Sequence, residues 1–248
     1  MPELLQNILI ILAVLVGASV SSIMGFGFTI LISPILLLLS LDPKTVVIVV
    51  NFSILIISFM VLIQSKNHLP IKEMTPVTIG GVVGVPLGVL TLDYVSDNTL
   101  RPTVAIMVII MTIIAIRHIT IPSLYNKITS VITGVVIGAF VGSTGIGGVL
   151  IAVSLLSKNY GKLSHRAAIS FFSIPAIIIS IIGYAITGLL TQERLFLIFI
   201  SIFPIVLGFI FGTKLLNSID DKTFQKGVIT LTLVSCVLIL SKAIFQSI

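Results

Sequence analysis

Polar positions divide this chain into eight apolar blocks, and the length of each block predicts how it crosses a membrane. A helix that spans the hydrocarbon core needs about 20 apolar residues. Most blocks are close to this length, but the first and the fifth are too long for one crossing. The approximate limits are 4–41, 45–63, 74–92, 102–116, 128–157, 167–187, 195–213 and 227–245. The pattern predicts an all-α integral membrane protein with two unusual segments.

Both over-long blocks are interrupted near the middle by clustered glycines. The interruptions are SSIMGFGFT at 21–29 and GSTGIGGVL at 142–150. Non-helical backbone at membrane depth is tolerated only where protein or a water-filled cavity surrounds it. A break also frees the first N–H groups of the following half-helix, which carry the positive end of the helix dipole and can hold an anion. Two such breaks predict a site for a small anion between them.

The candidate substrate-binding residues are the glycines, hydroxyls and neighbours of the two breaks. Glycine lets a ligand approach the backbone closely, and a hydroxyl adds a hydrogen-bond donor. At the first break the candidates are Ser21, Ser22, Gly25, Phe26, Gly27 and Thr29. At the second break they are Ser143, Thr144, Gly145, Ile146, Gly147 and Gly148.

Other polar residues of the apolar blocks are candidates for the same function. Asn51 is the only amide or charged residue in the core of the second block, so it either bridges helices or faces the ligand. Ser170 and Ser173 either link helices or bind the ligand. His165 and Arg166 open the sixth block, where they form either a cytoplasmic anchor or an electropositive vestibule.

Two other groups of glycines in the apolar blocks recur every four residues. GGVVGVPLG at 80–88 has this spacing, as do Gly134, Gly138 and Gly142. Small residues at this spacing form one stripe along a helix and allow close helix–helix approach. We therefore interpret these two stripes as packing surfaces and not as ligand sites.

The two glycine breaks belong to an internal repeat. GFG at 25–27 aligns with GIG at 145–147 at an offset of 120. Downstream, 84–100 aligns with 208–224 at an offset of 124. Two copies of one unit within a single transmembrane domain are typical of secondary transporters. The predicted copies are residues 1–120 and 121–248.

The basic residues distinguish two possible topologies. If each over-long block crosses once, the 14 Lys and Arg residues split 6 against 8. If each block folds back at its glycines, one side holds only Lys44, Arg101, Arg194 and Lys242, and the other holds 14 − 4 = 10. The positive-inside rule favours the second topology, with both termini outside the cytoplasm. It predicts two inverted repeats, each with a glycine-broken or re-entrant helical hairpin followed by three spanning helices.

Composition supports one membrane domain and excludes a soluble module. The chain is 57% hydrophobic and 9% charged, whereas a soluble domain has about 25% charged residues. The net charge is +6, and the basic residues lie in short loops between apolar blocks. We therefore expect the lipid bilayer and not nucleic acid as a partner. No Lys or Arg precedes Lys44, which favours a retained first helix over a cleaved signal peptide. We expect no metal site, no cofactor and no intramembrane carboxylate.

The two breaks resemble the glycine clusters of the TauE/SafE family of sulfite and organosulfur-anion exporters. The two copies read GFGFTILISPILLLLSLDPKTVV and GIGGVLIAVSLLSKNYGKLSHRAA, and the resemblance covers essentially the whole chain. Phe28 and Ser154 stand where the family usually has glycine and proline. The resemblance implies a cell-membrane permease for small anions such as sulfite or sulfonates. With the paired breaks, it implies an anion held near the midplane and alternating access.

Two other classes of function stay open. An intramembrane hydrolase would use Ser143 as nucleophile with a histidine base, and the nearest histidine in sequence is His165. A non-transporting membrane scaffold would explain the glycines as packing alone. The patterns also leave open the exact anion, the coupling ion, the net direction of transport and the oligomeric state.

Overall fold

The computed structural model describes residues 3–24, 26–116, 126–155, 158 and 160–215, and all regular elements in these ranges are helices. In chain order they are α1 (Glu3–Met24), α2 (Phe28–Leu38), α3 (Pro43–Ser65), the 3₁₀ turn η1 (Lys66–His68), α4 (Ile71–Tyr94), α5 (Asp97–Ile116), α6 (Lys127–Thr144), α7 (Gly147–Leu155), α8 (Lys162–Ile186) and α9 (Gln192–Leu215). Helices α1, α3, α4, α6, α8 and α9 are long and apolar enough to cross a membrane. The all-helical class is confirmed for these ranges. Gly25 and the block at 227–245 lie outside the described residues.

The first over-long block forms two helices of unequal length. Gly27 precedes α2 with a φ of 101°, which an L side chain adopts only with strain. The Gln6 side chain donates a hydrogen bond to the Leu39 carbonyl oxygen at 2.9 Å. Because this bond joins the start of α1 to the end of α2, the chain reverses direction between the two helices. Helix α2 has 11 residues, so it is only about 16 Å long.

The second over-long block has the same form. Helix α6 ends at Thr144, and Gly145 follows with a φ of 71°. A Cβ atom at Gly147 would lie 2.0 Å from Val141 Cγ2, so the first turn of α7 packs against the last turns of α6. Helix α7 has nine residues and a length of about 14 Å, which is about half of a hydrocarbon core of roughly 30 Å.

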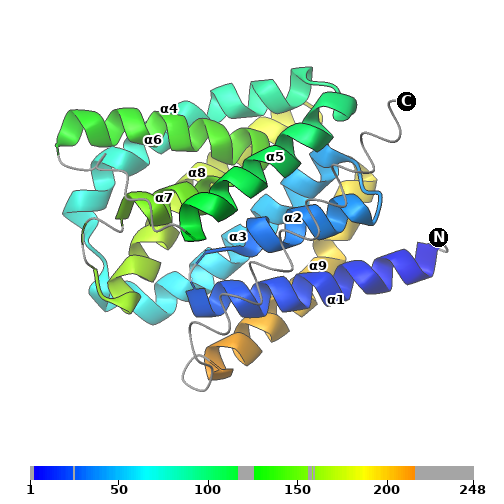
Figure 1. Cartoon of the computed structure of the whole chain (residues 1–248), viewed down its shortest axis with the longest axis horizontal. Helices are drawn as coiled ribbons and strands as arrows, with labels where there is room; N and C mark the ends of the chain where they lie inside the picture. Colours follow the sequence, from blue (N-terminus) through cyan, green and yellow to red (C-terminus); the bar gives the residue numbers. More distant parts are fainter. Residues whose placement is uncertain (1–2, 25, 117–125, 156–157, 159, 216–248) are drawn as a thin grey trace.

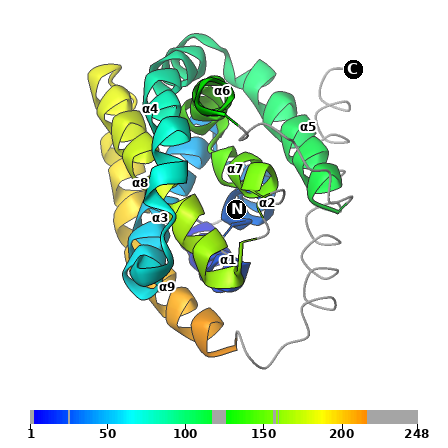
Figure 2. The ribbon, with the colours of Figure 1, turned by 90° about the vertical axis from the view of Figure 1, so that its left-hand side faces the viewer.

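The long helices surround the two short ones. Helix α4 packs on α6, α1 packs on α9, and α3 packs on α8. In Figure 1, α2 and α7 lie at middle height between α1 on one side and α4 and α6 on the other. In the end-on view of Figure 2, α3, α4, α8 and α9 form one side of the bundle, and α5 lies opposite them. The two short helices are therefore enclosed within the protein.

Glycines determine how closely two of these helix pairs approach. A Cβ atom would lie 1.9 Å from the Val135 carbonyl oxygen if placed on Gly84, and 2.1 Å from the Gly81 carbonyl oxygen if placed on Gly138. Helices α4 and α6 are thus in backbone contact along both predicted stripes, and the interpretation of these glycines as packing residues is confirmed. A Cβ atom on Gly208 of α9 would lie 2.3 Å from the Leu15 carbonyl oxygen of α1, so α1 and α9 approach in the same way.

Candidate functional site

A cavity lies where the first turns of the two short helices meet. Residues 26–29, at the start of α2, and residues 148–149, in the first turn of α7, both contribute to its wall. The Thr29 hydroxyl donates a hydrogen bond to the Gly145 carbonyl oxygen at 2.7 Å, and this bond is buried. The two breaks, which are 116 residues apart in the sequence, are therefore in direct contact.

The rest of the cavity wall comes from α1, α3 and α8. Ser21 lies near the end of α1, Ser58 and Val61 lie in the second half of α3, and Ser170 and Ser173 lie in the first half of α8. The remaining lining residues are Ile54, Ile57 and Ile169. The cavity is thus mostly apolar, with hydroxyl groups at several points of its wall.

Helices α3 and α8 run antiparallel, and their direction determines how the short helices enter. Asn51, in the first half of α3, donates to the hydroxyl of Tyr184 near the end of α8 at 2.7 Å. Val61, near the end of α3, shares the cavity with Ile169 near the start of α8. Since α2 leads into the start of α3 and α7 leads into the start of α8, the two short helices extend from the cavity toward opposite ends of the bundle.

This arrangement brings two positive helix ends to one cavity. The first N–H groups of a helix have no partner within the helix, and they carry about half a positive charge. Gly27, which caps α2, supplies no side-chain hydrogen bond to these groups. Apolar walls lower the local dielectric and so strengthen the attraction for an anion. The cavity is electrostatically suited to a small anion.

A buried hydrogen-bond network holds the second break in place. The Asn51 side-chain amide donates to the Val141 carbonyl oxygen at 3.1 Å as well as to Tyr184. The Tyr184 hydroxyl donates in turn to the Gly142 carbonyl oxygen at 2.8 Å. Gly142 lies in the last turn of α6, where carbonyl groups have no partner within the helix, and the Val141 carbonyl oxygen also accepts a bond from the Gly145 backbone N–H. Asn51 therefore bridges helices and does not line the cavity.

The structure brings about half of the predicted binding residues to the cavity. The predicted residues that line it are Ser21, Phe26, Gly27, Thr29, Gly148, Ser170 and Ser173. The described ones that do not line it are Ser22, Asn51, Ser143, Thr144, Gly145, Ile146 and Gly147. Gly25 lies outside the described residues. The first break contributes more of the wall than the second.

The hydroxyls of the second break are directed to their own helix. Ser143 donates to the Ala139 carbonyl oxygen and Thr144 to the Phe140 carbonyl oxygen, both at 2.8 Å. Serine and threonine within a helix commonly form such bonds to the preceding turn. The second break therefore contributes Gly148 and Val149 to the cavity wall and not these two side chains.

Sequence reasoning missed two residues of this region. Ser58 lines the cavity from α3. It could have been found from the sequence because it is a polar residue seven positions after Asn51, on the same helix face. Tyr184 is fully buried. It could have been found from the sequence because it places a hydroxyl group within an apolar block. A buried tyrosine hydroxyl usually finds a hydrogen-bond partner.

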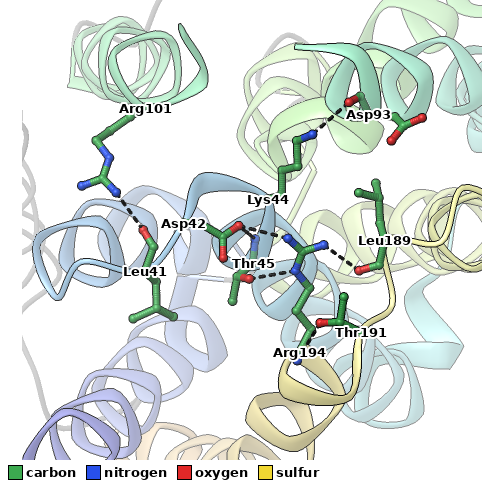
Figure 3. Close-up of polar contacts among 9 residues, drawn as sticks. All are labelled: Leu41, Asp42, Lys44, Thr45, Asp93, Arg101, Leu189, Thr191 and Arg194. Atoms are coloured by element: carbon green, nitrogen blue, oxygen red, sulfur yellow. Dashed lines mark hydrogen bonds and ion pairs between the residues drawn. The ribbon is translucent and has the colours of Figure 1, made fainter. Parts of the chain in front are cut away.

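At one end of the bundle, cationic side chains join several helices (Figure 3). Arg194 of α9 donates to the Thr45 hydroxyl at 2.8 Å and to the Leu189 carbonyl oxygen at 2.7 Å, and it pairs with Asp42 at 3.2 Å. Lys44 donates to the Asp93 carbonyl oxygen at 2.9 Å. These contacts link the start of α3 to α4 and α9. The Leu41 carbonyl oxygen also accepts a bond of 3.2 Å from Arg101 of α5.

The opposite end carries the two predicted vestibule residues. Arg166 is buried, with 4% of its surface exposed, and His165 is partly buried. Glu73 pairs with Lys158 at 3.6 Å and accepts a hydrogen bond from the Tyr160 hydroxyl. Burial, followed by the interaction with Glu73, raises the pKa of Tyr160 above its ordinary value.

No group of three or more His, Cys, Asp or Glu residues that could hold a metal ion occurs in the described ranges.

Comparison with known proteins identifies the family. Neither a curated protein sequence nor a solved structure shows a significant match to the chain. The family described as "Sulfite exporter TauE/SafE" matches residues 9–239 of the 248-residue chain. A match of this extent, to a chain with six helices able to cross a membrane, means that the protein belongs to the TauE/SafE family of membrane transporters.

Proposed function

We propose that this protein exports a small sulfur oxyanion, sulfite or an organosulfonate, through the cavity between α2 and α7. The observation that carries the proposal is that the N-terminal turns of both short helices line the same cavity. Two helix dipoles directed at one point favour a negative charge there. Hydroxyls of Ser170 and Ser173 in the same wall supply further donors.

The proposed architecture consists of two repeats, residues 1–120 and 121–248, in inverted orientation. The glycine contacts support it: Gly84 meets Val135 and Gly208 meets Leu15. Gly208 is 124 residues after Gly84, and Val135 is 120 residues after Leu15, which are the two offsets of the sequence repeat. The contact of α4 with α6 is therefore equivalent to the contact of α9 with α1. Opposite entry of α2 and α7 is also typical of inverted repeats in transporters.

The grouping of charges supports the fold-back topology in the cell membrane. A single crossing of each over-long block would place Lys44 and Arg194 on opposite sides, whereas Arg194 contacts Asp42 and Thr45, next to Lys44. The same end contains the bond from Gln6 to Leu39, near the N-terminus. Under the positive-inside rule this end, with few cations, faces away from the cytoplasm.

Alternating access then requires the Arg194 contacts to open. They join α9 to the start of α3 at the proposed external end, whereas the cavity wall includes the half of α3 nearer the other end. The described conformation fits a state closed to the outside. An inside-negative potential of 100 mV favours export of one negative charge by about 2.3 kcal/mol. Export of an ionised anion therefore needs no coupling ion.

Flux into proteoliposomes tests this proposal and its alternatives. Purified protein should carry sulfite or a small sulfonate down its gradient, and neither a hydrolase nor a scaffold would do so. Ser173→Ala should raise the apparent KM by up to about tenfold, because one neutral hydrogen bond contributes roughly 0.5–1.5 kcal/mol. Ser143→Ala is the matched control and should leave the KM unchanged, since its hydroxyl bonds to Ala139. Absence of flux for every sulfur oxyanion tested would contradict the proposal.

A further inference from the structure

Arg166 of α8 is a buried cation with hydrogen-bond donors that have no acceptor among the described residues. Its side chain is buried, and its Nε and Nη2 atoms have no hydrogen-bond partner among the described residues. Arg194, by comparison, forms three side-chain contacts with protein groups. A buried charge without a partner is costly, so proteins usually pair such groups. The guanidinium of Arg166 therefore has unused capacity for a ligand.

Glu73, an acidic residue at the same end of the bundle, is not an ion-pair partner of Arg166. Glu73 pairs with Lys158 and binds Tyr160, and about half of its side chain is exposed. No ion pair between Arg166 and any carboxylate occurs in the described part of the chain. Among the described residues, no carboxylate therefore neutralises the charge of Arg166.

The position of Arg166 connects it to the cavity. Arg166, Ser170 and Ser173 are spaced i, i+4 and i+7 on α8, so they lie on one face of that helix. Both serines line the cavity. Arg166 is one helical turn, about 6 Å, beyond Ser170 in the direction of the proposed cytoplasmic end. Arg166 does not itself line the cavity, so its guanidinium lies outside the cavity on the proposed cytoplasmic side.

A second residue at the same level has an unpartnered donor. Ser58, Val61 and Ser65 lie on one face of α3 at spacings of three and four residues. Because α3 and α8 are antiparallel, Ser65 in the last turn of α3 lies near the level of the first turns of α8. Its hydroxyl is buried and has no partner among the described residues. Helices α3 and α8 thus each place an unpartnered buried donor about one turn beyond the cavity wall.

We propose that Arg166, assisted by Ser65, forms the cytoplasmic-side binding site for the transported oxyanion, before the anion moves to the helix N-termini. Arginine offers only donors, arranged in a planar fork that matches two oxygens of a sulfonate, sulfite or carboxylate. The site therefore selects a ligand with at least two acceptor oxygens and a negative charge. This inference rests on the proposed transport of anions and adds the residue that recognises the charge.

The test compares Arg166→Gln and Arg166→Lys with wild type in two assays. In proteoliposomes, Arg166→Gln should raise the apparent KM for sulfite at least about tenfold, because a charge-assisted bidentate contact is lost. Arg166→Lys keeps the charge but not the fork, and it should give an intermediate KM. Lys158→Gln removes a positive charge from the same end and is the matched control, with an expected change of less than about twofold.

Thermal unfolding of the detergent-purified proteins separates binding from a structural role. Sulfite should raise the Tm of wild type and of Lys158→Gln, and it should not raise the Tm of Arg166→Gln. Without an anion, Arg166→Gln should be at least as stable as wild type, since it removes an unpaired buried charge. If Arg166→Gln does not fold, the KM and the sulfite-dependent Tm shift of Arg166→Lys decide the matter.

The outcomes for the two proposals differ. A wild-type KM and a wild-type sulfite-dependent Tm shift in Arg166→Gln, or in Arg166→Lys where only that variant folds, would overturn the role of Arg166 and leave anion transport intact. A wild-type protein without flux would overturn the proposed function. In that case, sulfite-dependent stabilisation that is lost in Arg166→Gln would still support the binding site, and stabilisation that persists in this variant would overturn it.

Discussion

Gly27 and Gly145 have positive φ angles at the two points where the chain reverses. At Gly145 a Cβ atom would also lie 3.3 Å from Val50 Cγ1 and 3.4 Å from Asn51 Oδ1. A side chain there would press on Asn51, which holds α6 to α8 through Tyr184. These two glycines were identified from the sequence because they interrupt over-long apolar blocks. The conformational reason for each became visible only with its φ angle.

Valine at either position should abolish transport while the protein still reaches the membrane. Gly145→Val and Gly27→Val each force a β-branched residue into the left-handed region, at a local cost of at least about 1–2 kcal/mol. Anion flux and membrane abundance should be measured together. Gly161→Ala is the control, because its Cβ would meet no atom within 4 Å and its φ is −61°. Normal flux in both valine variants would show that the shape of the breaks is unimportant for transport.

At the scale of helices, sequence patterns revealed the ends of elements better than their faces. The breaks at 25–27 and 145–147 could be located because glycine clusters are rare signals within apolar runs. Most of the cavity wall from α3 could not be predicted, because three of its four lining residues, Ile54, Ile57 and Val61, are apolar residues in a block with apolar residues on all sides, and periodicity then indicates no particular face. The bonds of Arg194 with Asp42 were also hidden, since partners 152 residues apart leave no local pattern.

The glycine contacts of α4 with α6 and of α9 with α1 should respond alike to added bulk. Gly84→Ala and Gly208→Ala each place a methyl group within 2.3 Å of a backbone carbonyl oxygen, so the helices must separate. Overpacking of this kind costs about 1–3 kcal/mol. We expect a lower Tm for both variants in detergent, compared with Gly161→Ala. A neutral effect at Gly208 with a large effect at Gly84 would contradict the equivalence of the two helix pairs.

The Asp42–Arg194 pair should control access to the cavity from the proposed external end. Asp42→Asn removes the ion pair but preserves the N-cap of α3, because asparagine can accept the bond from Thr45 N–H as Asp42 does. A cysteine introduced at Ser58, in a Cys236→Ser background, reports access to the cavity. An external, membrane-impermeant thiol reagent should label it faster in the Asp42→Asn and Arg194→Gln variants. Equal labelling rates in these two variants and in the parent protein without either substitution would show that these contacts are not a gate.

At the scale of the whole molecule, the ends of the bundle have different structures. Lys44, Arg101 and Arg194 are all bonded to neighbouring helices at one end, whereas Arg166 has unused donors near the other. The export proposed above would use this difference, because the anion must be attracted at the side where it enters and released where it leaves. The charge count from the sequence separated the same groups of residues before any contact was known.

The proposed topology rests on the unequal number of cations at the two ends and can be tested directly. The end that contains Lys44, Arg101 and Arg194 carries few cations, so the positive-inside rule places it outside the cytoplasm. The loop at 64–73 belongs to the opposite, cation-rich side. Reporter fusions that distinguish the cytoplasm from the exterior should therefore give opposite results in this loop and after Ile248, with the C-terminus outside. A cytoplasmic C-terminus would refute the fold-back of the over-long blocks across the membrane, and the direction proposed for the Arg166 site would then have to be reversed.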